Sequence, residues 1–70
     1  MNEKTMVEKL KELNEKGLIL DFTDFGDTYD FIVSNKEFGH KIVGKMRNEG
    51  FAIEVWDYGE FLSVEIFKGD

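Results

Sequence analysis

Residues 17–33 read GLILDFTDFGDTYDFIV, and this stretch predicts a β-hairpin. Two runs of alternating residues flank a short turn that contains glycine, which is typical of hairpins. Residues 50–66, GFAIEVWDYGEFLSVEI, repeat the pattern 33 positions later, so that Gly26 aligns with Gly59 and Asp24 with Asp57. We interpret these coincidences as internal symmetry, although two amphipathic units of the same order also align by chance. The four predicted strands cover residues 18–24, 28–33, 51–57 and 60–67.

An amphipathic helix is predicted before each hairpin, because apolar residues recur there at helical spacing. The stripes are Met6, Val7, Leu10 and Leu13 in the first helix, over residues 5–16, and Phe38, Ile42, Val43 and Met46 in the second. Capping-box spacing marks both starts, with Thr5 and Glu8 in one helix and Ser34 and Glu37 in the other. Gly17 and Gly50 stand where C-caps are expected.

These elements predict one α+β domain built from two αββ repeats, about 5–33 and 36–67. Neither repeat buries its apolar face alone, so the halves should pack together. We therefore expect a four-stranded antiparallel sheet with both helices on one face.

Strand alternation assigns the two faces of this sheet. The face predicted to meet the helices is almost wholly apolar and holds Leu18, Leu20, Phe22, Tyr29, Phe31, Val33, Phe51, Ile53, Val55, Leu62, Val64 and Ile66. The opposite face mixes acidic, small and large apolar side chains, namely Ile19, Asp21, Thr23, Phe25, Asp30, Ile32, Ala52, Glu54, Trp56, Tyr58, Phe61, Ser63, Glu65 and Phe67. Aromatic residues are frequent interface anchors, so we expect this face to bind a foreign partner or a second copy. Strand propensity alone is the alternative reason for its aromatic content.

The composition restricts the class of protein. The chain has 70 residues, no cysteine and a net charge of −6, which excludes disulfides and argues against direct binding of nucleic acid or an anionic membrane. A core this small often depends on self-association, so a homodimer is expected. The sequence contains neither an apolar run of about 20 residues nor a signal-peptide core, and a cytoplasmic location is the simplest expectation.

The acidic residues are segregated from the basic ones. The predicted hairpins contain no Lys or Arg, whereas eight basic residues fall in or beside the helices. The carboxylates predicted to be unneutralised are Asp21, Asp24, Asp27, Asp30, Glu54, Asp57, Glu60 and Glu65. Such a surface attracts a basic partner; a general acidic surface retained for solubility is the alternative.

Motifs for catalysis or metal binding are weak. Asp24-Phe25-Gly26 matches the magnesium tripeptide of kinases, but the chain is far too short for a kinase. A calcium loop from Asp21 fails because Ile32 occupies the place of the bidentate Glu. His40 is the only histidine, so zinc would need carboxylate ligands. We expect no enzyme activity and no cofactor, with weak divalent-cation binding or hydrolysis at the carboxylates as an open alternative.

In size, charge and aromatic content the chain resembles phage-encoded acidic DNA-mimic inhibitors, some of which block histone-like nucleoid proteins such as HU. The resemblance is one of class and includes no shared motif beyond the acidic hairpins. It implies a host-takeover protein, located in the host cytoplasm, whose hairpin carboxylates replace phosphates in the site of a basic nucleic-acid-binding protein. Trp56, Tyr58, Phe61 and Phe67 would anchor the partner or a homodimer. A structural or regulatory homodimer without DNA mimicry is the alternative function.

Overall fold

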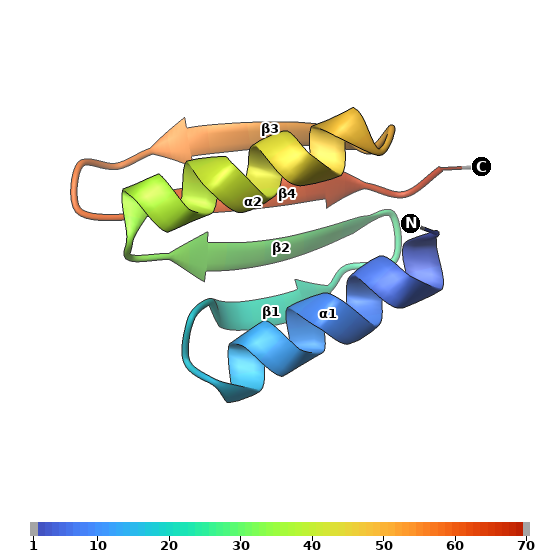
Figure 1. Ribbon diagram of the computed structural model, residues 1–70, viewed down its shortest axis with the longest axis horizontal. Coiled ribbons are helices and arrows are strands. Elements are labelled where there is room, and N and C mark those ends of the chain that lie inside the picture. The colour runs from blue at the N-terminus through green and yellow to red at the C-terminus, as the bar shows by residue number, and fades with distance from the viewer. Residues whose placement is uncertain (1, 70) are drawn as a thin grey trace.

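The computed structural model describes residues 2–69 and contains two helices and a four-stranded antiparallel sheet (Figure 1). The elements in chain order are α1 (Glu3–Glu15), β1 (Leu20–Asp24), β2 (Thr28–Val33), α2 (Lys36–Asn48), β3 (Ala52–Asp57) and β4 (Leu62–Phe67). The strand order in the sheet is β1-β2-β4-β3. In Figure 1 both helices lie in front of the sheet, with α1 beside β1 and α2 near β3 and β4. The predicted α+β class and antiparallel sheet are confirmed; duplication of the sequence stays a prediction.

An asparagine that was not predicted as a cap stands directly before each helix and is its N-cap. The Asn2 Oδ1 atom accepts a hydrogen bond from the Thr5 backbone N–H at 2.8 Å, and Asn35 Oδ1 accepts from Phe38 N–H at 3.0 Å. The predicted caps at Thr5 and Ser34 are therefore wrong. Asparagine is as good an N-cap as serine, and in each case it satisfies the amide three residues further along.

The C-caps of the two helices are Lys16 and Glu49, and the glycines that were predicted as C-caps follow them directly. Gly17 and Gly50 have φ values of +76° and +100°, in the left-handed region that glycine adopts without a Cβ clash. The next residue then donates its backbone N–H to a carbonyl of the last turn, from Leu18 to Leu13 at 3.0 Å and from Phe51 to Met46 at 3.2 Å. This Schellman arrangement turns the chain back toward the sheet.

The first strand contains a β-bulge that reverses part of the predicted face assignment. Leu20 pairs with Ile32 and Thr23 with Asp30, so β1 carries one more residue than β2 between these pairs, and Asp21 has a φ of +56°. An extra residue moves side chains to the opposite face. Leu18 and Leu20 are consequently 47% and 45% exposed, whereas Ile19 is fully buried, which is opposite to the prediction for all three.

The core lies between the sheet and the two helices. It contains Met6, Leu10, Leu13, Ile19, Tyr29, Phe31, Val33, Val43, Met46, Ile53, Leu62, Val64 and Ile66. The central strands β2 and β4 pair over six residues, and Phe31 is opposite Val64 within this ladder. The pairing of these strands also fixes the positions of the residues on the other face of the sheet, which is turned away from the helices. We call this face the open face.

Two glycines of α2 provide matched tests of how closely this helix contacts the sheet. A Cβ atom on Gly39 would lie 2.8 Å from Leu62 Cδ1 and 3.3 Å from Val33 Cβ, whereas one on Gly44 would meet nothing within 4 Å. Gly39→Ala is expected to destabilise the fold by about 1–3 kcal/mol through overpacking. Gly44→Ala is expected to stabilise it by about 0.5–1 kcal/mol through helix propensity. Urea unfolding measures both free energies, and stabilisation by both substitutions would contradict the tight packing at Gly39.

Candidate protein-binding surface

Three carboxylates stand side by side across the open face. In the strand register, Glu65 of β4 is opposite Asp30 of β2 on one side and opposite Glu54 of β3 on the other. Neighbouring strands are about 4.8 Å apart, so the three groups span about 10 Å. We call Asp30, Glu65 and Glu54 the acidic row. The four strands contain six Asp or Glu and no Lys or Arg, so no basic residue of the sheet interrupts it.

The middle carboxylate of the acidic row has a perturbed pKa. Partial burial raises the pKa of Glu65 above its ordinary value of 4.5, and the negative charges of Asp30 and Glu54 raise it further. Asp30 also accepts a hydrogen bond from the Thr28 hydroxyl at 3.1 Å. The acidic row is thus a place where like charges are held together by the register of the sheet, at a cost to stability.

Large apolar side chains flank the acidic row on both sides. One neighbouring row consists of Leu20, Ile32, Ser63 and Trp56, and the other contains Thr28, Phe67 and Ala52, as the strand register shows. Trp56 is 43% exposed and Phe67 is 39% exposed. The prediction placed Trp56 and Phe67 on this face, whereas Leu20 was expected in the core. The result is a charged strip between apolar strips on a rigid support.

The bulge in β1 leaves a shallow depression of about 210 Å³ beside the acidic row. It is lined by Asp21, Thr23, Phe25, Asp30, Phe31, Ile32 and Ser63. Asp21 and Asp30 therefore share one concave area. Since the left-handed backbone at Asp21 belongs to the bulge, strand alternation alone did not indicate this depression.

Two of the eight predicted carboxylates are neutralised. The Asp24 Oδ1 atom lies 2.6 Å from the Lys68 ammonium nitrogen, and both Asp57 carboxylate oxygens lie 3.1 Å from that of Lys36. The hydrogen bond from Lys68 lowers the pKa of Asp24. The expectation that Asp24 and Asp57 are unneutralised is wrong, because the lysines that reach them come from sequence positions 44 and 21 residues away.

Asp24 and Asp57 also organise the two hairpin turns. Each accepts a hydrogen bond from the backbone N–H two residues later, Asp24 from Gly26 at 2.9 Å and Asp57 from Gly59 at 2.8 Å. The backbone bond of the Gly59 amide is the main cause of the lowered pKa of Asp57. These are Asx-turns, in which the side chain replaces a backbone acceptor. The two aspartates therefore have a structural role.

The other predicted site residues lie in the turns at the two ends of the sheet. Asp27 and Glu60 are exposed, one in each hairpin turn. Tyr58 is exposed and stacks on Phe61, with ring centres 5.1 Å apart. These four residues lie outside the paired strands that carry the acidic row. The structure therefore brings together Asp30, Glu54, Glu65, Trp56 and Phe67, with Asp21 beside them, and leaves the turn residues at the ends.

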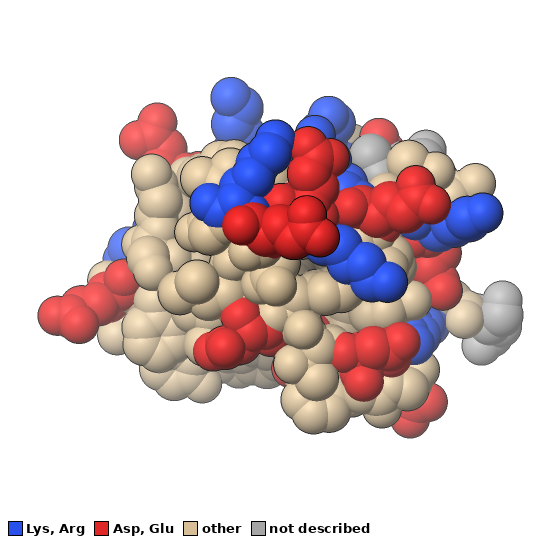
Figure 2. Space-filling view, turned by 90° about the horizontal axis from the view of Figure 1, so that it is seen from below, with Lys and Arg blue, Asp and Glu red and all other residues tan. Residues whose placement is uncertain are grey.

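The helices have a different charge pattern from the sheet. Together they contain seven Lys or Arg and five Glu. Figure 2, seen from the side of β1, shows basic and acidic side chains intermixed in its upper part and mainly acidic ones in its lower part. The two sides of the molecule therefore differ in charge, with the excess negative charge on the strands.

Within residues 2–69, no helix has the length and apolar character of a membrane span, and no three His, Cys, Asp or Glu side chains are grouped to hold a metal ion. In comparisons with family models, curated proteins and solved structures, no match to the chain was found.

Proposed function

We propose that this protein is an acidic, DNA-mimic-like inhibitor that occupies the DNA-binding site of a basic protein, such as an HU-like nucleoid protein. The observation that supports the proposal most strongly is the acidic row, Asp30, Glu65 and Glu54, on a sheet whose four strands contain no Lys or Arg. Clustered like charges reduce stability, and a cationic site on a partner relieves this repulsion.

The charge density of the acidic row suits a site that binds DNA. Three carboxylates over about 10 Å correspond to about three phosphates of one DNA strand, which carries one charge per about 3.4 Å of helix axis. A site whose Lys and Arg side chains contact consecutive phosphates therefore meets a similar density of negative charge here. Asp21 adds a further carboxylate beside the row.

The apolar strips beside the acidic row offer a partner hydrophobic contacts, which the phosphates of DNA do not offer. Trp56 and Phe67 are half exposed next to the carboxylates. Burial of such side chains contributes about 25 cal/mol per Å² of apolar surface, whereas the charges mainly accelerate and orient binding. The bound partner is therefore expected to be a protein with a basic surface and nearby apolar groups.

A structural homodimer without DNA mimicry is the second candidate function, and the exposed apolar strips of the open face favour it. Face-to-face packing of two copies would bring acidic rows close together, which like-charge repulsion opposes. Pairing along the β3 edge avoids this contact, and β3 keeps a regular register with β4 over all six residues. Sedimentation equilibrium, combined with the competition experiment described next, distinguishes the two functions, because a tight dimer that does not compete with DNA for a basic protein supports only the second.

Competition for DNA tests the proposed inhibitor. The protein is added to a complex of labelled DNA with purified HU, and DNA release is followed by fluorescence anisotropy. We expect release that weakens steeply with salt. The triple variant Asp30→Asn, Glu54→Gln, Glu65→Gln is expected to need at least about tenfold more protein, because three charge-assisted contacts are lost.

A matched variant separates local charge from total charge. Glu8, Glu15 and Glu49 lie outside the sheet, and their replacement by glutamine removes the same three charges. This control is expected to compete nearly as well as the parent protein. Equal competition by the acidic-row variant and the parent would disprove electrostatic mimicry, whereas equal losses in both triple variants would show that only net charge matters.

A further inference from the structure

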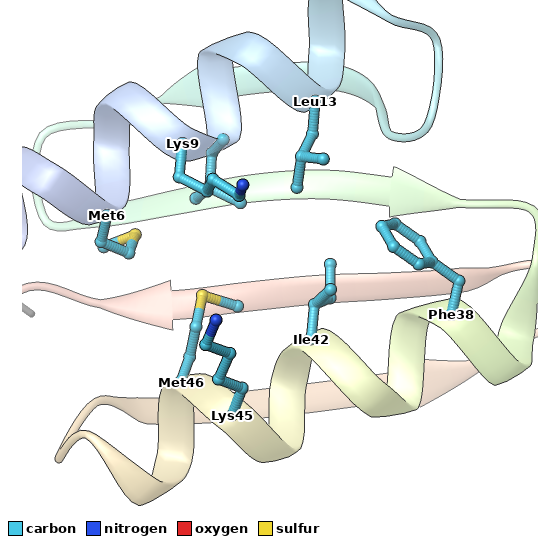
Figure 3. A pocket seen from close by; sticks show the side chains of 8 residues that line it. Met6, Lys9, Leu13, Phe38, Ile42, Lys45 and Met46 are labelled. Carbon is cyan, nitrogen blue, oxygen red and sulfur yellow. The ribbon is translucent and has the colours of Figure 1, made fainter.

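An apolar groove of about 180 Å³ runs between the two helices on the side opposite the open face (Figure 3). Its walls are Met6, Leu10 and Leu13 from α1 and Phe38, Ile42 and Met46 from α2. Most of these side chains are buried, and Ile42 and Phe38 are only partly so. The groove is therefore a narrow recess, too small to act as a broad docking face for a macromolecule.

Two lysines stand at this groove, one from each helix. Lys9 and Lys45 line it, and Figure 3 shows both ammonium groups directed toward the space between α1 and α2. Within residues 2–69, the ion pairs involve Lys16, Lys36 and Lys68, and neither groove lysine makes one. Two cations beside a recess without a carboxylate in its lining favour an anionic group between them.

The groove sets the size of the apolar part of a ligand. An apolar cavity of about 150 Å³ accepts benzene, so a groove of about 180 Å³ accommodates one aromatic ring. The thioethers of Met6 and Met46 adapt to ring shape and make favourable contacts with aromatic groups. The excess of basic over acidic residues on the helices also favours an anion on this side of the molecule.

We propose that this groove binds a small aryl carboxylate, with the ring between the helices and the carboxylate between Lys9 and Lys45. The site is separate from the acidic row, and the proposal does not depend on the proposed function. Because the groove is small and open, the expected Kd is on the order of 1 mM.

Three probes with the same ring and chain but different head groups test the ligand class: 3-phenylpropionate, 3-phenylpropanol and 3-phenylpropylammonium. Each is titrated into the isotope-labelled protein and followed by the NMR shifts of Leu10, Leu13 and Ile42. We expect saturable shifts at these residues, with the carboxylate binding at least about fivefold more tightly than the alcohol. The ammonium compound is expected to bind most weakly.

Two sets of variants examine the charge and the recess separately. Lys9→Gln with Lys45→Gln should remove the preference for the carboxylate while the alcohol still binds. Lys11→Gln with Lys41→Gln, which changes the same charge outside the groove lining, should preserve the preference. Ile42→Phe is expected to fill the groove and weaken all three probes, with folding verified by thermal unfolding.

Three outcomes would overturn the proposal. The first is that the NMR shifts at the groove do not saturate for any probe at concentrations up to about tenfold above the expected Kd. The second is that the ammonium and carboxylate compounds bind equally tightly. The third is that the shifts are confined to residues of the sheet. None of these outcomes affects the DNA-competition experiment, so failure of the groove site and failure of the proposed inhibitor are distinguishable.

Discussion

Phe31→Ala is expected to cause the largest loss of stability of any single side-chain truncation in this protein. Phe31 is fully buried on the central strand β2, opposite Val64 of β4. Truncation of a buried phenylalanine costs about 3–5 kcal/mol, since it removes apolar contacts and leaves a cavity. A domain of this length has a total stability of about 4–10 kcal/mol. The variant is therefore expected to be largely unfolded near 37 °C, which circular dichroism during thermal unfolding would measure.

Phe25→Ala is the matched control for this substitution. Phe25 lies in the first hairpin turn and is 64% exposed. Substitutions at exposed positions that make no cap, buried contact or strained backbone usually change the free energy of unfolding by less than about 0.5 kcal/mol. Similar unfolding temperatures for the two variants would mean that Phe31 does not occupy the centre of the core.

The local signals in the sequence were sufficient for the order and type of the elements. Apolar spacing, the glycines at Gly17 and Gly50 and the glycine-containing turns predicted two helices and two hairpins, and the structure confirms them. The sequence-based predictions were wrong where neighbouring residues could fill the same role or where the structure depends on a second strand. Asn2 and Asn35 cap the helices in place of Thr5 and Ser34, since neighbouring cap residues are nearly equivalent in energy. The bulge in β1 depends on its pairing with β2, which a single-strand pattern does not contain.

The candidate surface was predictable to the extent that it depends on strand alternation. Alternation placed Asp30, Glu54 and Glu65 on one face, and the strand register then aligned them. The strand order β1-β2-β4-β3 is tertiary information, so the acidic row itself was not visible in the sequence. The ion pairs of Asp24 and Asp57 depend on long-range contacts for the same reason. The groove between the helices was missed because helical stripes alone indicate a core without indicating how fully it is filled.

Neutralising the acidic row is expected to stabilise the fold at pH 7 while it removes competition with DNA. The variant Asp30→Asn, Glu54→Gln, Glu65→Gln eliminates two cross-strand contacts between like charges. We expect its Tm to rise by roughly 5–10 °C. The asparagine can still accept the hydrogen bond from Thr28, so the change isolates charge. A lower Tm would mean that the row contributes favourable contacts, and the inferred strain would be wrong.

The pH dependence gives a second, independent measure of this strain. The pKa of Glu65 is raised above 4.5 in the fold, so its contribution to stability is present at low pH and is lost as pH rises through the raised pKa. The pKa values of Asp24 and Asp57 are lowered below 3.8, so their contributions are lost only as pH falls through those lower values. Stability should therefore increase from pH 7 toward 4.5 and decrease below 3.8.

Thermal unfolding across this pH range separates the acidic row from the net charge of the protein. In the acidic-row variant the increase from pH 7 toward 4.5 should be much smaller, whereas the decrease below 3.8 should remain because Asp24 and Asp57 are unchanged. The variant of Glu8, Glu15 and Glu49 has the same net charge and should keep most of the increase. Identical profiles for the two variants would assign the effect to total charge. If the acidic row lowers stability at neutral pH and is also required for competition with DNA, the row is retained for binding and not for folding. This combination is expected of a surface that functions only when a cationic partner covers it.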